Sequence, residues 1–503
     1  MLKMIATIGV IQVVAIVMNV IRSKVLAVLL GPVGVGVVSV IDQTVQLVAY
    51  ISAFSLPFAA VKFLSLSHSQ GPAAFARTYG LFVRMLLILT TIGTAISLVI
   101  VWVQPHSLGS ELDNYRAFLL PALLAVPGMA LQGFFSSVLA AAQKARTSAV
   151  MSVIVAFVLT GAAYLGIRFA GIAGFYWCNV FAGLLVVVVM LVYLSRKLDM
   201  PLFGRPQGLG AEFRAHPRVI TFAFILFSTS VTYSLSYFMA RYTVLTGFGP
   251  AEAGLLQAAI ALAASLNLVL NPANGLYLTP ILNRDVPHAD KMHVASEFQS
   301  KLMLVISMIA MPMVLFPQWL ITLFYSSSFL TVSFAVPVFV VAQCMVQLAG
   351  VYQALLIGVD DLKFYGLIVS TTQILLGVLA WVLAPYYGIL GVGIACLISS
   401  TATFFLTLAR LGHKYGFRVS PRLWLSMSYG LLALLLSGAI MNHYDTWALP
   451  VIVSKLALYL LFLFSLLVFL SREERQELFR RVEQSLAYIR FRGDTDPMPR
   501  LPQ

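Results

Sequence analysis

The chain has 503 residues, of which 60% are hydrophobic and only 10% are charged. Soluble domains carry about 25% charged residues, so this composition excludes an ordinary aqueous fold and predicts helices packed in lipid. A net charge of +14 would favour a nucleic-acid partner in a soluble chain. In a membrane chain it is explained by orientation, and no nucleic acid is expected.

Apolar blocks bounded by Gly, Pro and charge predict about fourteen transmembrane helices. In chain order they are expected near 5–30, 34–64, 78–103, 117–142, 147–169, 171–194, 217–243, 251–282, 300–325, 330–358, 364–385, 388–411, 421–441 and 447–470. The first block begins at Ile5 with no cleavage signal before it, so we expect a retained helix rather than a signal peptide.

Positive charge gathers on one side of these helices. An even number of helices puts both termini on the same side, and most of the 32 Lys and Arg lie in the loops and tails there. The exceptions are Arg22, Lys24, Arg116, Arg168, Arg241 and Lys455. Because loops rich in Lys and Arg are translocated poorly, both termini are predicted to be cytoplasmic.

The sequence repeats itself at a displacement of about 218 residues. The matching pairs are Arg22 with Arg241, Gly31-Pro32 with Gly249-Pro250, Trp102 with Trp319, Lys144 with Lys363, Gly171-Ile172 with Gly388-Ile389, and Cys178 with Cys396. Six helices per repeat is an even number, so both copies enter the membrane in the same orientation. Transporters place substrate sites between such halves.

We therefore predict an all-α, polytopic membrane protein with two parallel six-helix lobes and two extra C-terminal helices. The predicted units are an N-lobe at 1–198, a cytoplasmic linker at 199–216, a C-lobe at 217–415, the extra helix pair at 416–470 and a basic tail at 471–503. The tail has one apolar stripe among arginines. It is expected to lie on the anionic cytoplasmic leaflet, with a partner-binding helix as the alternative.

Polar side chains share helix faces inside several predicted spans, where they are costly unless they face a cavity or a partner. The faces consist of Asn267, Asn271 and Asn274; Ser230, Tyr233, Tyr237 and Arg241; Gln343 and Gln347; and Asp42 with Gln46. We predict a central cavity whose amides and hydroxyls bind sugar hydroxyls, with Arg22 and Arg241 holding a phosphate group.

Each of these residues also has a plainer interpretation. The asparagines would equally serve as helix-helix contacts, and both arginines lie near helix ends from which they could snorkel to the interface. Asp42 could couple protons, pair with Arg22 or Lys24, or act as a neutral hydrogen-bonding group. Lys62 is either a phosphate contact or an anchor at the cytoplasmic surface.

Catalytic signatures are missing from the sequence. It has no phosphate-binding loop ending in Lys-Ser/Thr, no nucleophile elbow and no zinc-binding histidine pair. We therefore expect no enzyme activity, no cofactor and no metal.

Two segments resemble a known family. The run KVLAVLLGPVGVG from Lys24 to Gly36 resembles the first-helix signature of Wzx-type polysaccharide flippases, in the multidrug/oligosaccharidyl-lipid/polysaccharide exporter superfamily. The run LYLTPILNR from Leu276 to Arg284 is similar to that family's helix 8 end. With the six-plus-six repeat, the resemblance covers about 1–415. Of the cavity cations that the family implies, Lys24 is the one carried over, because it adjoins the matching signature.

The resemblance implies a flippase of the bacterial inner membrane. Its cargo would be a polyprenyl-pyrophosphate-linked oligosaccharide for O-antigen or other surface polysaccharide, moved by alternating access of the two lobes. Membrane lipids, a polysaccharide polymerase and a chain-length regulator are the expected partners. Three alternatives stay open: a lipid II flippase, a multidrug or cation antiporter of the same superfamily, and, from another class, a polysaccharide polymerase or ligase.

Overall fold

The computed structural model describes residues 2–103, 115–198, 217–273, 278–282, 286–441 and 448–466, and these contain helices and no strand. The first half holds α1 (Leu2–Ala53), α2 (Leu56–Ser69), α3 (Pro72–Val103), α5 (Arg116–Leu124), α6 (Val126–Ala141) and α7 (Ala145–Leu198). The second half holds α9 (Pro217–Phe248), α10 (Pro250–Ala273), α11 (Thr279–Leu282), α12 (His288–Leu315), α13 (Pro317–Phe324), η3 (Ser327–Phe334), α14 (Val336–Gly358), α15 (Leu362–Tyr387), α16 (Ile389–Tyr415), α17 (Pro421–Met441) and α18 (Leu449–Leu466). The predicted linker at 199–216 and tail at 471–503 lie outside the described residues.

The predicted polytopic fold is confirmed. Eleven described helices are long and apolar enough to cross a membrane. Two of them, α1 and α7, are double helices that turn back at Gly31 and Gly171, where φ is 63° and 60°. The mostly apolar α10 adds another crossing, so the described residues agree with a 14-helix protein.

Several predicted helices are broken where the sequence pattern indicated continuity. The breaks lie at Ser55, Ala125, Phe316 and Ala335, and in each case the new helix has Pro at its first or second position. Proline is tolerated at the start of a helix because the backbone N–H that it lacks would have no helical partner there. In the middle of a helix, proline removes a backbone hydrogen bond. Apolar blocks alone did not reveal these short restarts.

The repeat is visible in the backbone. Six residues with left-handed φ form three pairs separated by about 218 positions. They are Gly31 with Gly249 (63° and 89°), Gln143 with Asp360 (56° and 61°), and Gly171 with Gly388 (60° and 56°). Matching backbone conformations at matching turns support one helix pattern used twice.

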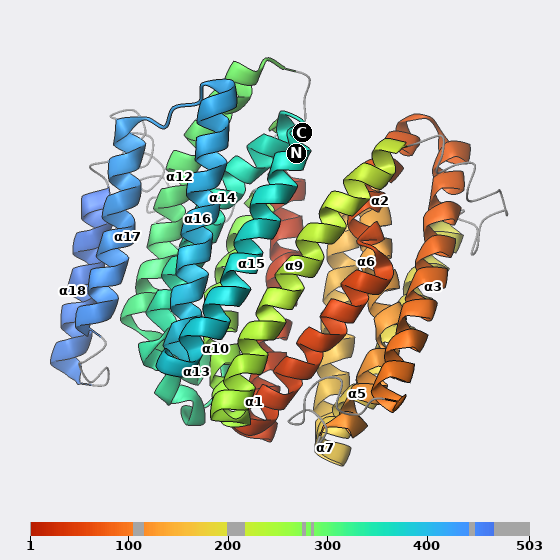
Figure 1. The fold of residues 1–503 in the computed structure, drawn as a ribbon, viewed down its shortest axis with the longest axis horizontal. Coiled ribbons are helices and arrows are strands. Elements are labelled where there is room, and N and C mark those ends of the chain that lie inside the picture. Colours follow the sequence, from red (N-terminus) through yellow and green to blue (C-terminus); the bar gives the residue numbers. More distant parts are fainter. Residues whose placement is uncertain are drawn as a thin grey trace, which may run out of the picture.

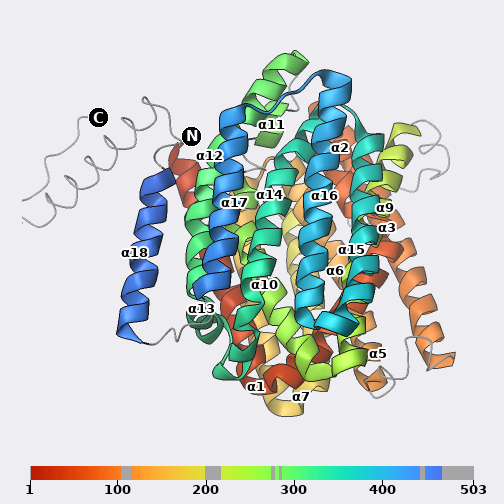
Figure 2. The same cartoon turned by 60° about the vertical axis from the view of Figure 1, so that its left-hand side comes forward.

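The two halves meet along α1, α9 and α10. The helix α1 packs against α7 in its own half and against α9 and α10 of the other half, as Figures 1 and 2 show. Next to the turn at Gly31, α1 and α10 come into backbone contact at Gly36 and Gly254. This contact holds the backbones of the two halves close together next to the turn.

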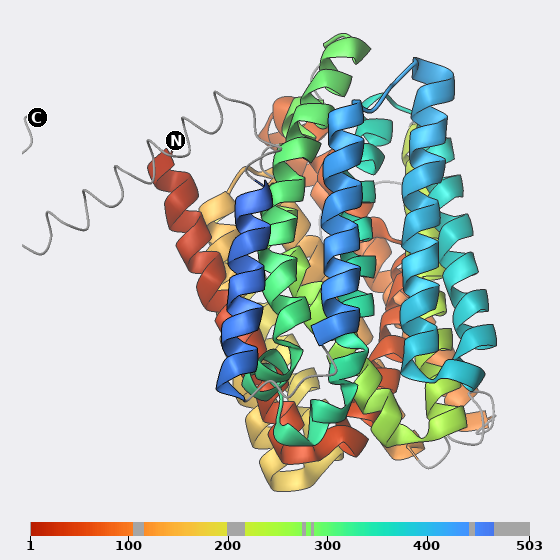
Figure 3. The ribbon, with the colours of Figure 1, turned by 90° about the vertical axis from the view of Figure 1, so that its left-hand side faces the viewer.

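The extra helices α17 and α18 form the outer edge of the second half in Figure 1 and face the viewer in Figure 3. Hydrogen bonds join α18 to its neighbours: the Tyr459 hydroxyl donates to the Met308 carbonyl on α12 at 3.1 Å, and Tyr429 of α17 pairs with Ser465 at 2.6 Å. The outer surface carries large apolar side chains such as Phe169 and Phe464, which are 83% and 74% exposed. Such a surface fits lipid rather than water.

Candidate functional site

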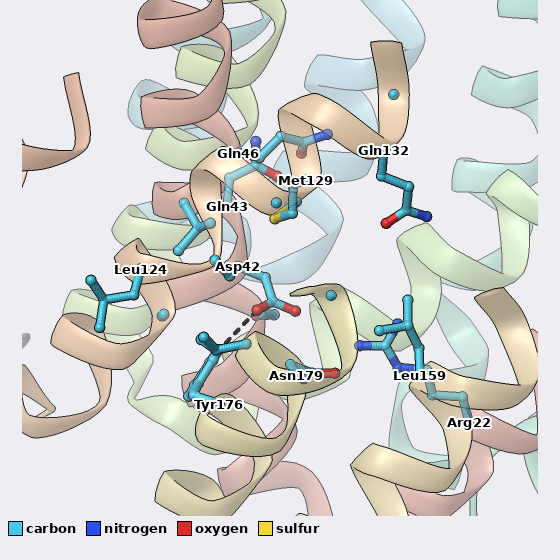
Figure 4. A pocket seen from close by; sticks show the side chains of 18 of the residues that line it. Arg22, Asp42, Gln43, Gln46, Leu124, Met129, Gln132, Leu159, Tyr176 and Asn179 are labelled. Atoms are coloured by element: carbon cyan, nitrogen blue, oxygen red, sulfur yellow. Dashed lines mark hydrogen bonds between the residues drawn. The ribbon is translucent and has the colours of Figure 1, made fainter. Parts of the chain in front are cut away.

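The structure has two cavities, one lined mostly by the first half and one lined by the second half, and they differ in charge. The first, here the charged cavity, has a volume of about 580 Å³ and is lined by Arg22, Asp42, Gln46, Tyr176, Asn179 and Arg241, with apolar residues between them. Figure 4 shows it from close by. The second, here the amide cavity, has a volume of about 360 Å³ and is lined by Asn267, Gln343, Gln347, Gln353 and Gln373, with Tyr233 and Tyr237 beside them.

Asp42 is the carboxylate residue in the lining of the charged cavity. It lies on the second arm of α1, and its carboxylate is open to the cavity. The Tyr176 hydroxyl of α7 donates to this carboxylate at 3.1 Å (Figure 4). Of the three alternatives for Asp42, a pairing with Arg22 or Lys24 is not present as an ion pair within 4.0 Å in the described part of the chain.

Arg22 is the unpaired cation of the same cavity. Its Nε atom is buried and has no hydrogen-bond partner, and its Cζ lies 5.7 Å from the centre of the Phe175 ring. In Figure 4 the guanidinium faces the space that Asp42 also faces. A buried donor without a partner is costly, so Arg22 is suited to bind an anion that enters the cavity.

Arg241, the repeat partner of Arg22, is instead braced by amides. It is only 6% exposed, and it donates to the Gln257 side chain of α10 at 2.7 and 3.2 Å and to Gln43 of α1 at 3.0 Å. Gln43 in turn donates to the Ser234 hydroxyl at 2.9 Å. Arg241 therefore ties α9 to both α1 and α10 and does not snorkel to the interface.

The amide cavity is organised around Asn267. The carbonyl oxygen of Asn267 accepts hydrogen bonds from Gln343, at 2.7 Å, and from Gln347. Gln347 is only 4% exposed. No Lys, Arg, Asp or Glu lines this cavity. The three side chains come from α10 and α14, so helix packing unites faces that the sequence could only describe separately.

The remaining predicted site residues lie elsewhere. Lys24 donates to the carbonyls of Thr322 and Leu323 at 3.3 and 3.1 Å, near the end of α13, and it lines neither cavity. Lys62 is exposed and lies 4.6 Å from the centre of the Phe222 ring, also outside both cavities. The side chain of Asn271, and Asn274 altogether, lie outside the described residues.

Sequence reasoning missed three residues that complete the charged cavity. Gln257 extends the helix face of Asn267 toward the start of the helix, and Gln43 adjoins Asp42. Neither residue is charged, so nothing in the sequence was a reason to select them. Tyr176 is one more tyrosine in an apolar block. Only the contacts with Arg241 and Asp42 give these side chains a role.

No protein-family model matches the chain, and no curated protein sequence matches it significantly. Solved structures do match it. A lipid II flippase MurJ in an inward closed conformation has a TM-score of 0.66 and 12% identity, covering 92% of this chain and 98% of its own. An inward-facing multidrug resistance MATE family transporter of the MOP superfamily has a TM-score of 0.65 and 13% identity, covering 80% and 98%.

A third similar structure is a MOP superfamily transporter from Pyrococcus furiosus, described as having a binding pocket of reversed polarity. Its TM-score is 0.56 at 12% identity, covering 86% of this chain and 96% of its own. The chain thus has the fold of MOP superfamily transporters and is a multi-pass membrane protein. A shared fold does not specify a cargo, which has to be argued from the site.

Proposed function

We propose that this protein is a flippase of the bacterial inner membrane that moves a polyprenyl-pyrophosphate-linked oligosaccharide between leaflets. The observation that carries the proposal is the unpaired guanidinium of Arg22 in a cavity of about 580 Å³ inside a membrane protein. A guanidinium fork binds phosphate oxygens through two parallel charge-assisted hydrogen bonds. A lipid-linked pyrophosphate presents such oxygens at membrane depth.

The charge balance of the cavity supports an anionic cargo. Two guanidinium groups, those of Arg22 and Arg241, face one carboxylate, that of Asp42. The partners of Arg241 are neutral amides, so its charge is not cancelled. A site of low dielectric with excess positive charge attracts anions and repels cations. This balance disfavours the alternative of a cation antiporter.

Alternating access is supported by how the halves are closed. The cavity residues on the second arm of α1 and on α10 all follow Gly36 and Gly254, the point of backbone contact, while Arg22 lies on the first arm of α1, before the turn at Gly31. With the N-terminus in the cytoplasm, that contact lies at the periplasmic end, and the cavities lie on its cytoplasmic side. The inward-facing MATE transporter is also more similar than an outward-facing one, with TM-scores of 0.65 and 0.57. We assign this structure to the inward-facing part of the cycle, with the lobes 1–198 and 217–415 as the moving bodies.

A lipid II flippase is the nearest rival, since the similar MurJ structure covers 92% of the chain, against 80% for the inward-facing MATE transporter. Lipid II is itself a lipid-linked sugar, so the charged cavity suits either cargo. Depletion of the protein separates the two: lethality favours lipid II, and viable cells that lack a surface polysaccharide favour our proposal.

Reconstitution tests the proposal directly. Purified protein is placed in liposomes with a fluorescent polyprenyl-pyrophosphoryl saccharide, and flipping is followed by a membrane-impermeant quencher. We expect wild-type protein to flip the lipid, Arg22→Ala to slow flipping at least about tenfold, and Arg22→Lys to retain part of it. Arg168→Ala is the matched control, because Arg168 is exposed on α7 and lines neither cavity.

Two results would reject the proposal. Liposomes in which wild-type protein moves no lipid exclude a flippase, and equal rates for wild type and Arg22→Ala exclude the role of Arg22. A polymerase is separated in cells: a deletion strain that still exports single repeat units lacks a polymerase, whereas a strain that traps them inside lacks a flippase.

A further inference from the structure

The amide cavity differs from the charged cavity in that no charged side chain lines it. We propose that it is a second ligand site, which binds the uncharged, hydroxylated sugar of the cargo while the charged cavity holds the pyrophosphate. This inference rests on the proposed function and deepens it by dividing the cargo between two sites. The amide cavity has a volume of about 360 Å³, within the range of about 300–1,000 Å³ that is typical of small-molecule sites.

Residues at equivalent positions of the repeat have exchanged their chemistry. With the offset of 218, Asp42 of the charged cavity corresponds to Ile260 of the amide cavity. In the other direction, Met129 of the charged cavity corresponds to Gln347 of the amide cavity. Both arginines of the matching pair, Arg22 and Arg241, line the charged cavity. The duplication thus holds one site for an anion and one for a neutral polar group.

The amides are held in place before any ligand arrives. Because Asn267 accepts from both Gln343 and Gln347, the three side chains fix one another across α10 and α14. On α15, the Oε1 atom of Gln373 is buried and has no hydrogen-bond partner. A buried acceptor without a partner carries a desolvation cost that a ligand hydroxyl would remove.

The class of ligand follows from these groups. A carboxamide offers both donors and acceptors, as a sugar hydroxyl does, so the two pair in either direction. The lining has no charged side chain, and a buried ligand charge would therefore stay uncompensated. Tyr233 is 42% exposed, and its ring lies 4.7 Å from that of Tyr237, centre to centre. This pair offers an aromatic surface for the apolar face of a pyranose.

The two cavities meet at Arg241 and Tyr237. Arg241 lines the charged cavity, and its Cζ lies 5.7 Å from the ring centre of Tyr237, which lines the amide cavity. An anionic group bound by Arg22 and Arg241 would therefore lie close to Tyr237, in the wall of the amide cavity. The sugar attached to a lipid pyrophosphate occupies that position relative to its phosphates.

Binding of two lipids to the full-length protein in nanodiscs tests the division. One probe is polyprenyl pyrophosphate without sugar, and the other is the same lipid carrying N-acetylglucosamine. We expect the wild type to bind the sugar-bearing lipid more tightly. Gln373→Ala and Gln353→Ala are expected to lose about tenfold in affinity for the sugar-bearing lipid and to bind the sugar-free lipid unchanged. Gln318→Ala, on α13 and outside both cavities, is the matched control.

The outcomes distinguish the two proposals. If the wild type binds both lipids equally, or Gln373→Ala and Gln353→Ala keep the wild-type preference, the amide cavity is not a sugar site, while the flippase proposal stands. If the wild type binds neither lipid, the proposed function itself fails. Unchanged binding of the sugar-free lipid by a glutamine variant shows that the variant is folded, so a lost sugar preference is then specific.

Discussion

Gly36 of α1 and Gly254 of α10 contact each other in a nearly symmetric way at equivalent positions of the two repeats. A Cβ added to Gly36 would collide with the carbonyl oxygen of Pro250 and lie 2.8 Å from the amide nitrogen of Gly254. A Cβ added to Gly254 would collide with the carbonyl oxygen of Pro32 and lie 3.0 Å from the amide nitrogen of Gly36. Only hydrogen side chains allow two helix backbones to come this close in a membrane.

Substitution of either glycine by alanine is expected to open this closed end. The collision is with backbone and cannot be relieved by a rotamer change, so the helices must separate at a cost of about 1–3 kcal/mol to the closed state. A cysteine in place of Ser39, which lines the charged cavity, reports the opening through a membrane-impermeant maleimide. In a chain whose three native cysteines are replaced, we expect faster labelling of Gly36→Ala and Gly254→Ala from the side that we propose to be the periplasm.

Gly247→Ala provides the control for these variants, because a Cβ at Gly247 meets nothing within 4 Å. It should label like the parent chain. Equal labelling of the parent, Gly36→Ala and Gly254→Ala would show that this contact does not close the end of the protein that we propose to face the periplasm.

The two arginines of the repeat are expected to affect different properties. Arg241→Ala leaves Gln43 and Gln257 without their donor, which should lower the free energy of unfolding by about 1–3 kcal/mol and the melting temperature by several degrees. Arg22→Ala removes a side chain with an unsatisfied donor and should leave the melting temperature near that of the wild type. Thermal unfolding in detergent, followed by tryptophan fluorescence, compares them. Equal losses would contradict the assignment of Arg241 as the brace.

Asp42→Asn is expected to strengthen binding of sugar-free polyprenyl pyrophosphate about three- to tenfold. The substitution removes the single carboxylate that lines the charged cavity, while asparagine still accepts a hydrogen bond from Tyr176. Affinity measured in nanodiscs at two salt concentrations checks the effect, which should shrink at higher salt. Tyr176→Phe, which keeps the carboxylate, is the control. Weaker binding by Asp42→Asn would indicate that the carboxylate assists the ligand.

Asp361, which lies between α14 and α15 and outside the membrane-spanning helices, belongs to an ionic cluster that predicts a pH-dependent stability. The Asp361 carboxylate forms ion pairs with Arg410, whose Nε lies 2.8 Å away, and with Lys414, whose Nζ lies 3.4 Å away. Burial of Asp361 raises its pKa, but the hydrogen bonds and charges of the two cations outweigh it and hold the pKa below its usual value. Because this pKa is lowered, the ion pairs of Asp361 stabilise the folded protein at pH values above the unfolded-state pKa of about 4. This stabilisation is lost as the pH falls through the folded-state pKa of Asp361.

Asp361→Asn should accordingly be less stable than the wild type by about 1–3 kcal/mol at pH 7, with the gap closing below about pH 4. Melting temperatures of both proteins across this range measure it. A gap that persists unchanged at low pH would assign the effect to packing rather than to charge.

Much of the architecture could be predicted because it depends on local properties of the chain. Apolar blocks of membrane length gave the helix count, and Gly31-Pro32 with its copy Gly249-Pro250 marked equivalent turns. The same reasoning put Arg241 with Tyr233 and Tyr237 on one helix face. It could not show that Gln43 and Gln257 hold Arg241, because their positions depend on how α1 and α10 rotate about their axes when they pack.

The sequence by itself determined that this chain crosses the membrane many times, that it is built from two similar halves, and that cations and amides occur at membrane depth. The tertiary structure decided their distribution. It brought Arg22, Arg241 and Asp42 into one cavity, gathered Asn267, Gln343 and Gln347 in another, and turned Lys24 toward the end of α13. Helix spacing fixes which residues share a face, whereas the neighbours that a face meets are fixed only when helices distant in sequence pack together.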